Sequence, residues 1–185
     1  VVTESKPVAK IGDTGYATLK AAFDAAKDGD TINLVSNVTM TEKITINKSV
    51  TLNAAYHTIT GVSDNADVNF EITGGTFTVK DGTFTGFGDK ITTVDKAAVF
   101  KIPSTASNAR IEATIVTVKN FNRAAFDVRS GSFKLTDCQI DCDNGQDQRL
   151  TKGVVAGYDT AAVTGTLSYC RINGAKSDYK GWSAS

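Results

Sequence analysis

The architecture of this chain is indicated by one segment, Phe77-Thr78-Val79-Lys80-Asp81-Gly82-Thr83-Phe84, in which two short alternations of apolar and polar residues flank a turn. The pattern returns in Phe133-Lys134-Leu135-Thr136-Asp137-Cys138-Gln139-Ile140 and in Gly165-Thr166-Leu167-Ser168-Tyr169-Cys170-Arg171-Ile172, and the three segments align without a gap. Related runs recur roughly every 25 to 30 residues, a period that indicates stacked supersecondary units.

Further strands are expected on both sides of these segments. In residues 31–35, 43–47 and 50–52, aliphatic residues alternate with threonine, lysine and asparagine, so one face of each strand is interior. A second series, residues 66–70, 97–102, 124–128 and 153–156, opens the later repeats. Three strands per turn, stacked in parallel around an apolar interior, predict an all-β fold: a single-stranded right-handed parallel β-helix, or solenoid. The alternative is an immunoglobulin-like sandwich, which requires hairpin turns such as Asn144-Gly145.

Each repeat is expected to bend at a polar corner. Asp81, Asn120 and Asp137 are assigned to this corner because aspartate and asparagine tolerate left-handed backbone angles. The residue after the corner turns inward, and this position is assigned to Gly82, Phe121, Cys138 and Cys170. We interpret the column of corner residues as mechanical and not as a ligand site.

The N-terminal part differs from the rest of the chain. Residues 8–12 predict an edge-like strand, and residues 13–16 a turn. A helix is then expected, with Thr18 as its N-cap, Gly29 at its end, and one apolar stripe formed by Leu19, Ala22, Phe23 and Ala26. Such a helix would cap the open end of a β-helix. We therefore expect one domain over residues 1–185, with the N-terminal strand and capping helix in residues 1–30 and stacked repeats in residues 31–185.

Composition excludes several functions. Lysine and arginine (20) balance aspartate and glutamate (20), so no basic field favours nucleic acid. No stretch approaches the roughly 18 consecutive apolar residues of a membrane span, and membrane insertion is not expected. The chain begins with Val1 and not methionine, which fits a processed secreted protein or a fragment of a longer one.

The first third of the chain resembles the opening of pectate-lyase-like β-helix domains. The resemblance lies in residues 8–12 (VAKIG), 16–22 (YATLKAA), 25–34 (AAKDGDTINL) and 44–52 (ITINKSVTL). Such domains are common in large secreted or cell-surface proteins of bacteria, so the resemblance implies an extracellular or cell-surface location within a larger surface protein. It does not imply one activity, because the superfamily contains lyases, hydrolases, phage tailspikes, adhesins and modules without known chemistry.

A lyase of this superfamily would hold calcium with carboxylates and use an arginine as the base. One acidic cluster could contribute to such a site, formed by Asp141, Asp143, Asn144 and Asp147. The same residues are also typical of an ordinary polar turn, the interpretation we favour. The single histidine, His57, lies in a predicted turn and is interpreted as a surface residue. No cofactor is expected, except calcium if the cluster binds it.

Glycan binding is the other class of function considered. Aromatic and hydrogen-bonding side chains near the C-terminus are its candidate ligand residues: Tyr158, Tyr169, Arg171 and Trp182. Tyr169 occupies the corner where other repeats carry aspartate or asparagine. An aromatic side chain that points outward at this corner is more readily explained by contact with a ligand. The alternative is that these aromatic residues cover the C-terminal end of the stack.

Cys138 and Cys170 fall at the same position of two successive repeats, which would place their backbones about 4.8 Å apart. They could form a disulfide. Cysteine is among the residue types that are most often buried, which favours two stacked free thiols over a disulfide.

Together these observations predict a non-catalytic bacterial module, secreted or on the cell surface, with an adhesive or structural role and a glycan or another surface protein as its partner. The alternatives are a calcium-dependent polysaccharide lyase or other carbohydrate-active enzyme, and a phage tailspike or fibre segment, which would form a trimer.

Overall fold

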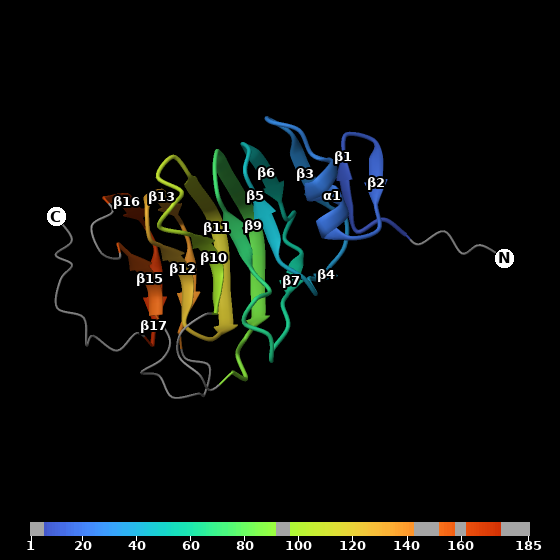
Figure 1. Cartoon of the computed structure of the whole chain (residues 1–185). Coiled ribbons are helices and arrows are strands. Elements are labelled where there is room, and N and C mark those ends of the chain that lie inside the picture. Colours follow the sequence, from blue (N-terminus) through green and yellow to red (C-terminus); the bar gives the residue numbers. More distant parts are fainter. Residues whose placement is uncertain (1–5, 92–96, 143–151, 158–161, 175–185) are drawn as a thin grey trace.

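The chain folds mainly into β-strands. The fold is seen in a computed structural model, which describes residues 6–91, 97–142, 152–157 and 162–174. Within these residues there is one helix, α1 (Leu19–Ala25), and the strands form two sheets. Figure 1 shows the strands side by side along the molecule, from β2 at one end to β16 at the other. The all-β class expected from the sequence is confirmed.

The larger sheet has a main path in which consecutive repeats lie next to each other. Its order is β2 (Thr14–Tyr16), β1 (Ala9–Ile11), β3 (Thr31–Leu34), β6 (Val50–Asn53), β9 (Thr76–Phe87), β11 (Arg110–Phe121), β13 (Gly131–Thr136) and β16 (Val163–Ser168). Four shorter strands also belong to this sheet: β4 (Val38–Thr39), β7 (Thr58–Thr60), β14 (Gln139–Asp141) and β17 (Arg171–Asn173). Among the described strands, only the pairs that β1 makes with β2 and β3 are antiparallel.

The smaller sheet is parallel throughout its described part. Its order is β15 (Lys152–Ala156), β12 (Ala124–Val128), β10 (Ala98–Ile102), β8 (Phe70–Ile72) and β5 (Ile44–Ile46). The chain alternates between the sheets, and we call one strand of the smaller sheet with the following strands of the larger sheet a repeat. An immunoglobulin-like sandwich consists of antiparallel strands, many of them joined by hairpins. The parallel pairing seen here shows that this alternative was wrong.

The pairing register confirms the gapless alignment. Phe77 pairs with Ile111, Ile111 with Phe133, and Phe133 with Gly165, so these four residues form one column across the larger sheet. Glycine at the last position has a steric reason, since a Cβ at Gly165 would lie 2.1 Å from the Phe133 ring.

The register also corrects the assignment of the corner. Residues 111–118 of β11 are the repeat between residues 77–84 and 133–140, so the corner residue is Ile115 and the inward residue is Val116. Asn120 and Phe121 belong elsewhere: Asn120 lies beside Gly86 at a second bend, and both have positive φ (48° and 74°). The sequence concealed this because Ile115 carries none of the side-chain chemistry of a corner residue.

Stacked phenylalanine rings form the centre of the core. Phe70, Phe100 and Phe126 come from successive strands of the smaller sheet, and the rings of Phe100 and Phe126 stack at 4.9 Å. Phe84 of the larger sheet packs edge-on against Phe100, also at 4.9 Å. The core therefore fills the space between the two sheets.

Helix α1 packs on the N-terminal end of this core. Its Phe23 ring makes edge contacts with Phe70 (6.0 Å) and Phe77 (5.8 Å). Thr18 is the N-cap, as predicted, because its Oγ1 accepts a hydrogen bond from the Ala21 N–H (3.1 Å). The predicted end was wrong, since the helix ends at Ala25 and Gly29 lies in the following turn.

Three other expectations about strands were wrong. The strand expected at the edge is β1, which lies between β2 and β3, and β2 occupies residues that were expected to be a turn. The strand expected over residues 66–70 begins only at Phe70 and continues to Ile72. In each case tertiary pairing, which local sequence does not report, sets where the strand starts.

Candidate functional site

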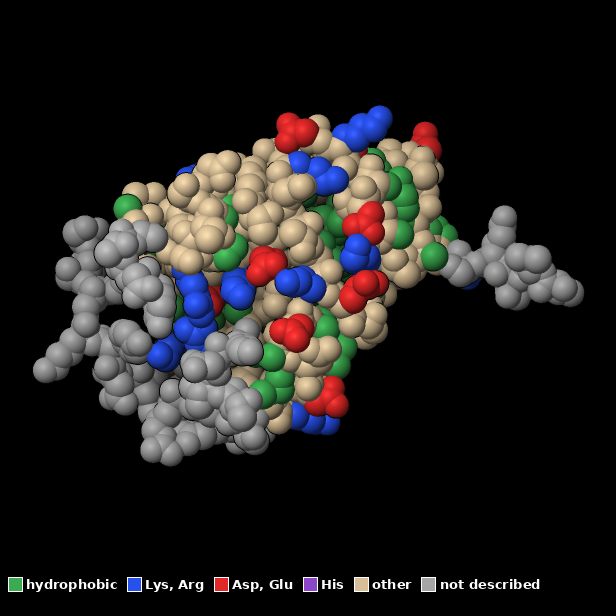
Figure 2. Space-filling view, in the orientation of Figure 1, with side chains coloured by type: hydrophobic (Ala, Val, Ile, Leu, Met, Phe, Trp, Pro, Cys, Tyr) green, Lys and Arg blue, Asp and Glu red, His purple; other side chains and the backbone are tan. Residues whose placement is uncertain are grey.

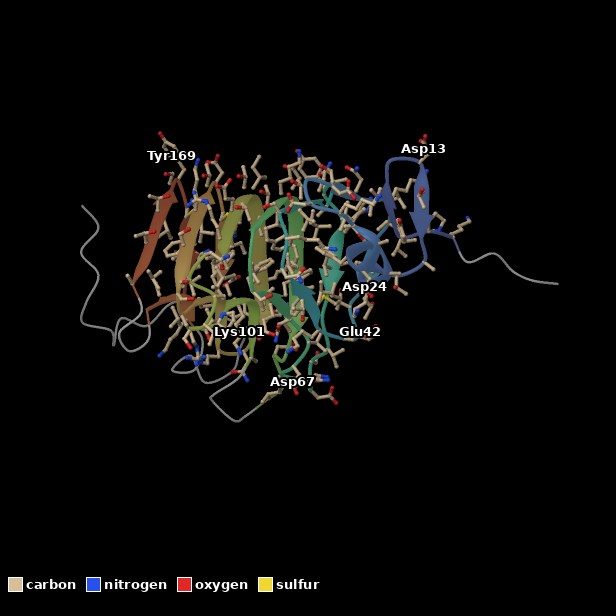
Figure 3. All side chains as sticks on the ribbon, turned by 45° about the horizontal axis from the view of Figure 1, so that its top comes forward. Asp13, Asp24, Glu42, Asp67, Lys101 and Tyr169 are labelled. Atoms are coloured by element: carbon tan, nitrogen blue, oxygen red, sulfur yellow. The ribbon has the colours of Figure 1, made fainter. Side chains whose placement is uncertain are left out.

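Tyr169 is the most exposed large apolar side chain among the described residues. It lies between β16 and β17 with φ of 56°, and 89% of its surface is accessible. Figure 3 shows its side chain pointing away from the strands, near the C-terminal end of the stack. The sequence placed Tyr169 at a corner, and the structure shows it at the same corner as Asp137 in the preceding repeat.

Polar side chains follow Tyr169 along the last two described repeats. Arg171 pairs in register with Gln139, and Asn173 pairs with Asp141. All four lie at outward positions, because the residues between them, Ile140 and Ile172, occupy the inward column. Parallel neighbours lie about 4.8 Å apart, so these groups and the Asp137 carboxylate form one compact surface.

This surface carries the side chains that recognise sugars. The face of an aromatic ring packs against the apolar face of a pyranose, while carboxylate and amide oxygens accept hydrogen bonds from hydroxyls. Arg171 supplies N–H donors, and within the described residues its guanidinium has no ion-pair partner. The arrangement suits binding, with both donors and acceptors beside an exposed ring.

Only part of the predicted site falls within the described residues. Tyr169 and Arg171 lie on one repeat, two residues apart, whereas Tyr158 and Trp182 lie outside the described residues. Of the calcium candidates, Asp141 lies on β14, and Asp143, Asn144 and Asp147 lie outside. The described part of the chain contains no group of three or more histidine, cysteine, aspartate or glutamate side chains that could hold a metal ion. Calcium binding by this cluster stays a prediction.

The cysteines lie inside the stack. Cys138 and Cys170 occupy the same inward position of adjacent repeats, and both are free thiols. Burial raises the pKa of the Cys138 thiol to about 11, and it raises that of Cys142 to about 11 as well. No disulfide joins Cys138 and Cys170 in this structure.

The corner beside Tyr169 extends across the molecule, and sequence reasoning missed two of its members, Tyr56 and Ile115. Residues with positive φ occupy it in register in four successive repeats: Asp81, Ile115, Asp137 and Tyr169. Tyr56 also has positive φ and lies in the longer bend of the repeat before them, where residues 54–57 stand opposite residues 81–82. We call these five residues the corner ridge. The backbone N–H of Tyr56 donates to the Asp81 carbonyl, which places Tyr56 directly beside Asp81. Tyr56 is 79% exposed and Ile115 is 48% exposed. Aligning residues 111–118 with the other repeats would have placed Ile115 at the corner, whereas its residue type gave no such indication.

Charges on the smaller sheet are paired with one another. Glu71 lies between Lys43 (3.0 Å) and Lys101 (3.7 Å), and buried Asp127 bridges Arg123 (2.9 Å) and Arg129 (3.1 Å). Figure 2 shows acidic and basic side chains interspersed across the middle of the visible face. This pairing stabilises neighbouring strands and leaves no large field of one sign among them.

Comparisons with known proteins give no further assignment: no family model, curated protein or solved structure matches the chain. The resemblance to pectate-lyase-like domains therefore rests on the residues quoted above. Among the described residues, no helix has both the length and the apolar character needed to cross a membrane.

Proposed function

We propose that the chain is a right-handed parallel β-helix capped by α1, and that it is a non-catalytic glycan-binding module of a bacterial surface protein. The fold is supported by the parallel pairing of successive repeats in both sheets. Right-handedness is supported by the strong general preference of crossover connections between parallel strands. The cap is supported by Phe23, which packs on the first rings of the phenylalanine stack.

The surface location follows from the resemblance of the first third of the chain to secreted and cell-surface β-helix domains. An adhesive or structural role follows from the same resemblance. A stack of parallel repeats is suited to both, because it presents long outward faces on a rigid core.

One observation carries the glycan-binding proposal: Tyr169 is 89% exposed at a left-handed corner, where aspartate occupies the preceding repeat. A tyrosine at this backbone conformation gains nothing locally over aspartate or asparagine. An exposed aromatic ring beside Arg171, Gln139 and Asp137 is explained by contact with a sugar.

The proposal is tested on a glycan array with the purified chain. Tyr169→Asn is the main variant, because asparagine suits the left-handed corner and removes the ring without adding a charge beside Asp137. Tyr169→Phe keeps the ring, and Asp13→Ala changes an exposed residue at the opposite end of the stack (Figure 3). Binding of the wild-type chain and of the Tyr169→Phe and Asp13→Ala variants, with loss of binding in Tyr169→Asn, is the expected result.

An array without signal for the wild-type chain would contradict the glycan-binding proposal, and so would undiminished binding by Tyr169→Asn. Circular dichroism and thermal melting of each variant show whether a loss of binding reflects the ring or the fold. A polysaccharide lyase would instead yield unsaturated products that absorb in the ultraviolet, and a tailspike segment would form a trimer in light scattering.

A further inference from the structure

We propose that the whole corner ridge binds a linear, uncharged, β-1,4-linked polysaccharide that lies along the stack, with one sugar per repeat. This inference rests on the proposed glycan-binding function at Tyr169 and extends that site to Tyr56, four repeats away. It is carried by the order, the exposure and the backbone conformation of the five ridge residues.

The order of the ridge residues alternates in chemical character. Tyr56, Ile115 and Tyr169 have apolar faces, and they are separated by the carboxylates of Asp81 and Asp137. Adjacent repeats lie about 4.8 Å apart, so the backbones of Ile115 and Tyr169 are spaced by about 9.6 Å, and Tyr56 lies two repeats before Ile115 in a bend with two more residues. The ridge therefore offers an apolar contact at every second step and hydrogen-bond acceptors between these contacts.

The exposure of the three apolar ridge residues, Tyr56, Ile115 and Tyr169, has no explanation in the packing of the core. Ile115 is a β-branched residue with φ of 54°, a conformation that its side chain disfavours. Its 48% exposure means that the strain is not compensated by full burial. Strained residues of this kind are often retained for function, and contact with a ligand would explain an isoleucine between two aspartates.

The ligand class follows from this alternation. In a β-1,4-linked chain each sugar is flipped relative to the last, so every second sugar presents the same face, as the apolar ridge members require. The next outward column runs parallel to the ridge and offers a hydrogen-bonding group at every repeat: Thr58, Thr83, Thr117, Gln139 and Arg171. The two ridge carboxylates disfavour an acidic polysaccharide, which points to an uncharged one.

The test uses isothermal titration of the intact chain with uncharged β-1,4-linked oligosaccharides, from disaccharides to octasaccharides of glucose, mannose and N-acetylglucosamine. The affinity of the wild-type chain is expected to rise about tenfold or more between disaccharide and octasaccharide, because a second aromatic contact engages. Tyr56→Asn and Ile115→Asn, which suit the left-handed backbone and add no charge, should each remove most of this gain and leave the disaccharide affinity unchanged. Lys134→Ala, an exposed residue away from the ridge, should keep the gain.

The Ile115→Asn variant separates binding from folding, since asparagine relieves the strain and is expected to raise the melting temperature while octasaccharide affinity falls. An affinity that does not grow with length would overturn the ridge proposal, as would an unchanged gain in Tyr56→Asn and Ile115→Asn. If binding of oligosaccharides of every length survives Tyr169→Asn undiminished, the proposed function itself fails, so the two failures are distinguishable.

Discussion

Asp81 and Ile115 occupy the same corner of adjacent repeats, with φ of 56° and 54°. Their backbones are almost identical, yet aspartate tolerates this left-handed conformation and isoleucine does not, because its branched Cβ crowds the backbone. The sheet imposes the bend on residue 115 through its neighbours on both sides, Asp81 and Asp137. Pairing thus overrides the local preference of the residue.

Replacing Ile115 with a residue that tolerates the left-handed corner should stabilise the protein. We expect Ile115→Asn to raise the free energy of unfolding by about 1 kcal/mol, because the strain of a β-branched residue in the left-handed region is removed and no charge is added between Asp81 and Asp137. Ile115→Val keeps the branched Cβ and should give no increase. Urea unfolding of the three proteins measures the difference, and equal stability of the asparagine and valine variants would contradict it.

Loss of the buried carboxylate should be far more damaging than loss of an exposed one. Asp127 is buried between Arg123 and Arg129, so Asp127→Ala leaves two guanidinium groups without their shared partner and should cost about 3–5 kcal/mol. Glu71→Ala is the matched control in the same sheet. Its carboxylate is partly exposed, and we expect a cost of about 1 kcal/mol or less. Comparable losses in the two variants, measured by chemical unfolding, would refute the special role of Asp127.

The phenylalanine stack should make the largest contribution of any packing contact between the sheets. Phe100 touches rings from both sheets, including Phe126 and Phe84, each at 4.9 Å. Phe100→Ala should lower the free energy of unfolding by about 3–5 kcal/mol, because it leaves a cavity at the centre of the core. Phe100→Leu fills most of the space and should cost clearly less. Thermal unfolding followed by calorimetry would show the order, and a milder effect of alanine than of leucine would disprove it.

Stability should fall in alkaline solution through the buried thiols. Burial raises the pKa of Cys138 from 9.0 to about 11, so the folded chain holds this proton while the unfolded chain has lost it. The contribution is complete below about pH 9 and is lost as pH rises toward 11, by roughly 2–3 kcal/mol.

The measurement is the free energy of unfolding between pH 7 and 11 for the wild-type chain and for Cys138→Ala. A shallower decline is expected in the variant, because its folded and unfolded states no longer differ in that proton. Parallel curves for the two proteins would show that Cys138 does not titrate in this way.

Much of the fold could be predicted from local patterns. The alternation of Phe77, Val79 and Phe84 with polar residues reports which face of a strand is buried, and Asp81 and Asp137 report where the chain bends. Thr18 reports the start of the helix through its capping hydroxyl. These signals lie within a few residues of one another, so they can be read without knowledge of partners.

The sites were less predictable, because they join distant residues. Tyr169 and Arg171 were found since both lie on one repeat, whereas Tyr56 and Ile115 are separated from Tyr169 by much of the chain. Only the pairing of β11 with β9 and β13 shows that Ile115 is a corner residue and that the exposed side chains form one ridge. The alternation of apolar and polar residues is a property of each strand alone and can therefore be recognised in the sequence. Register depends on the fit between side chains of neighbouring strands, so only the tertiary structure decides which residues share a surface.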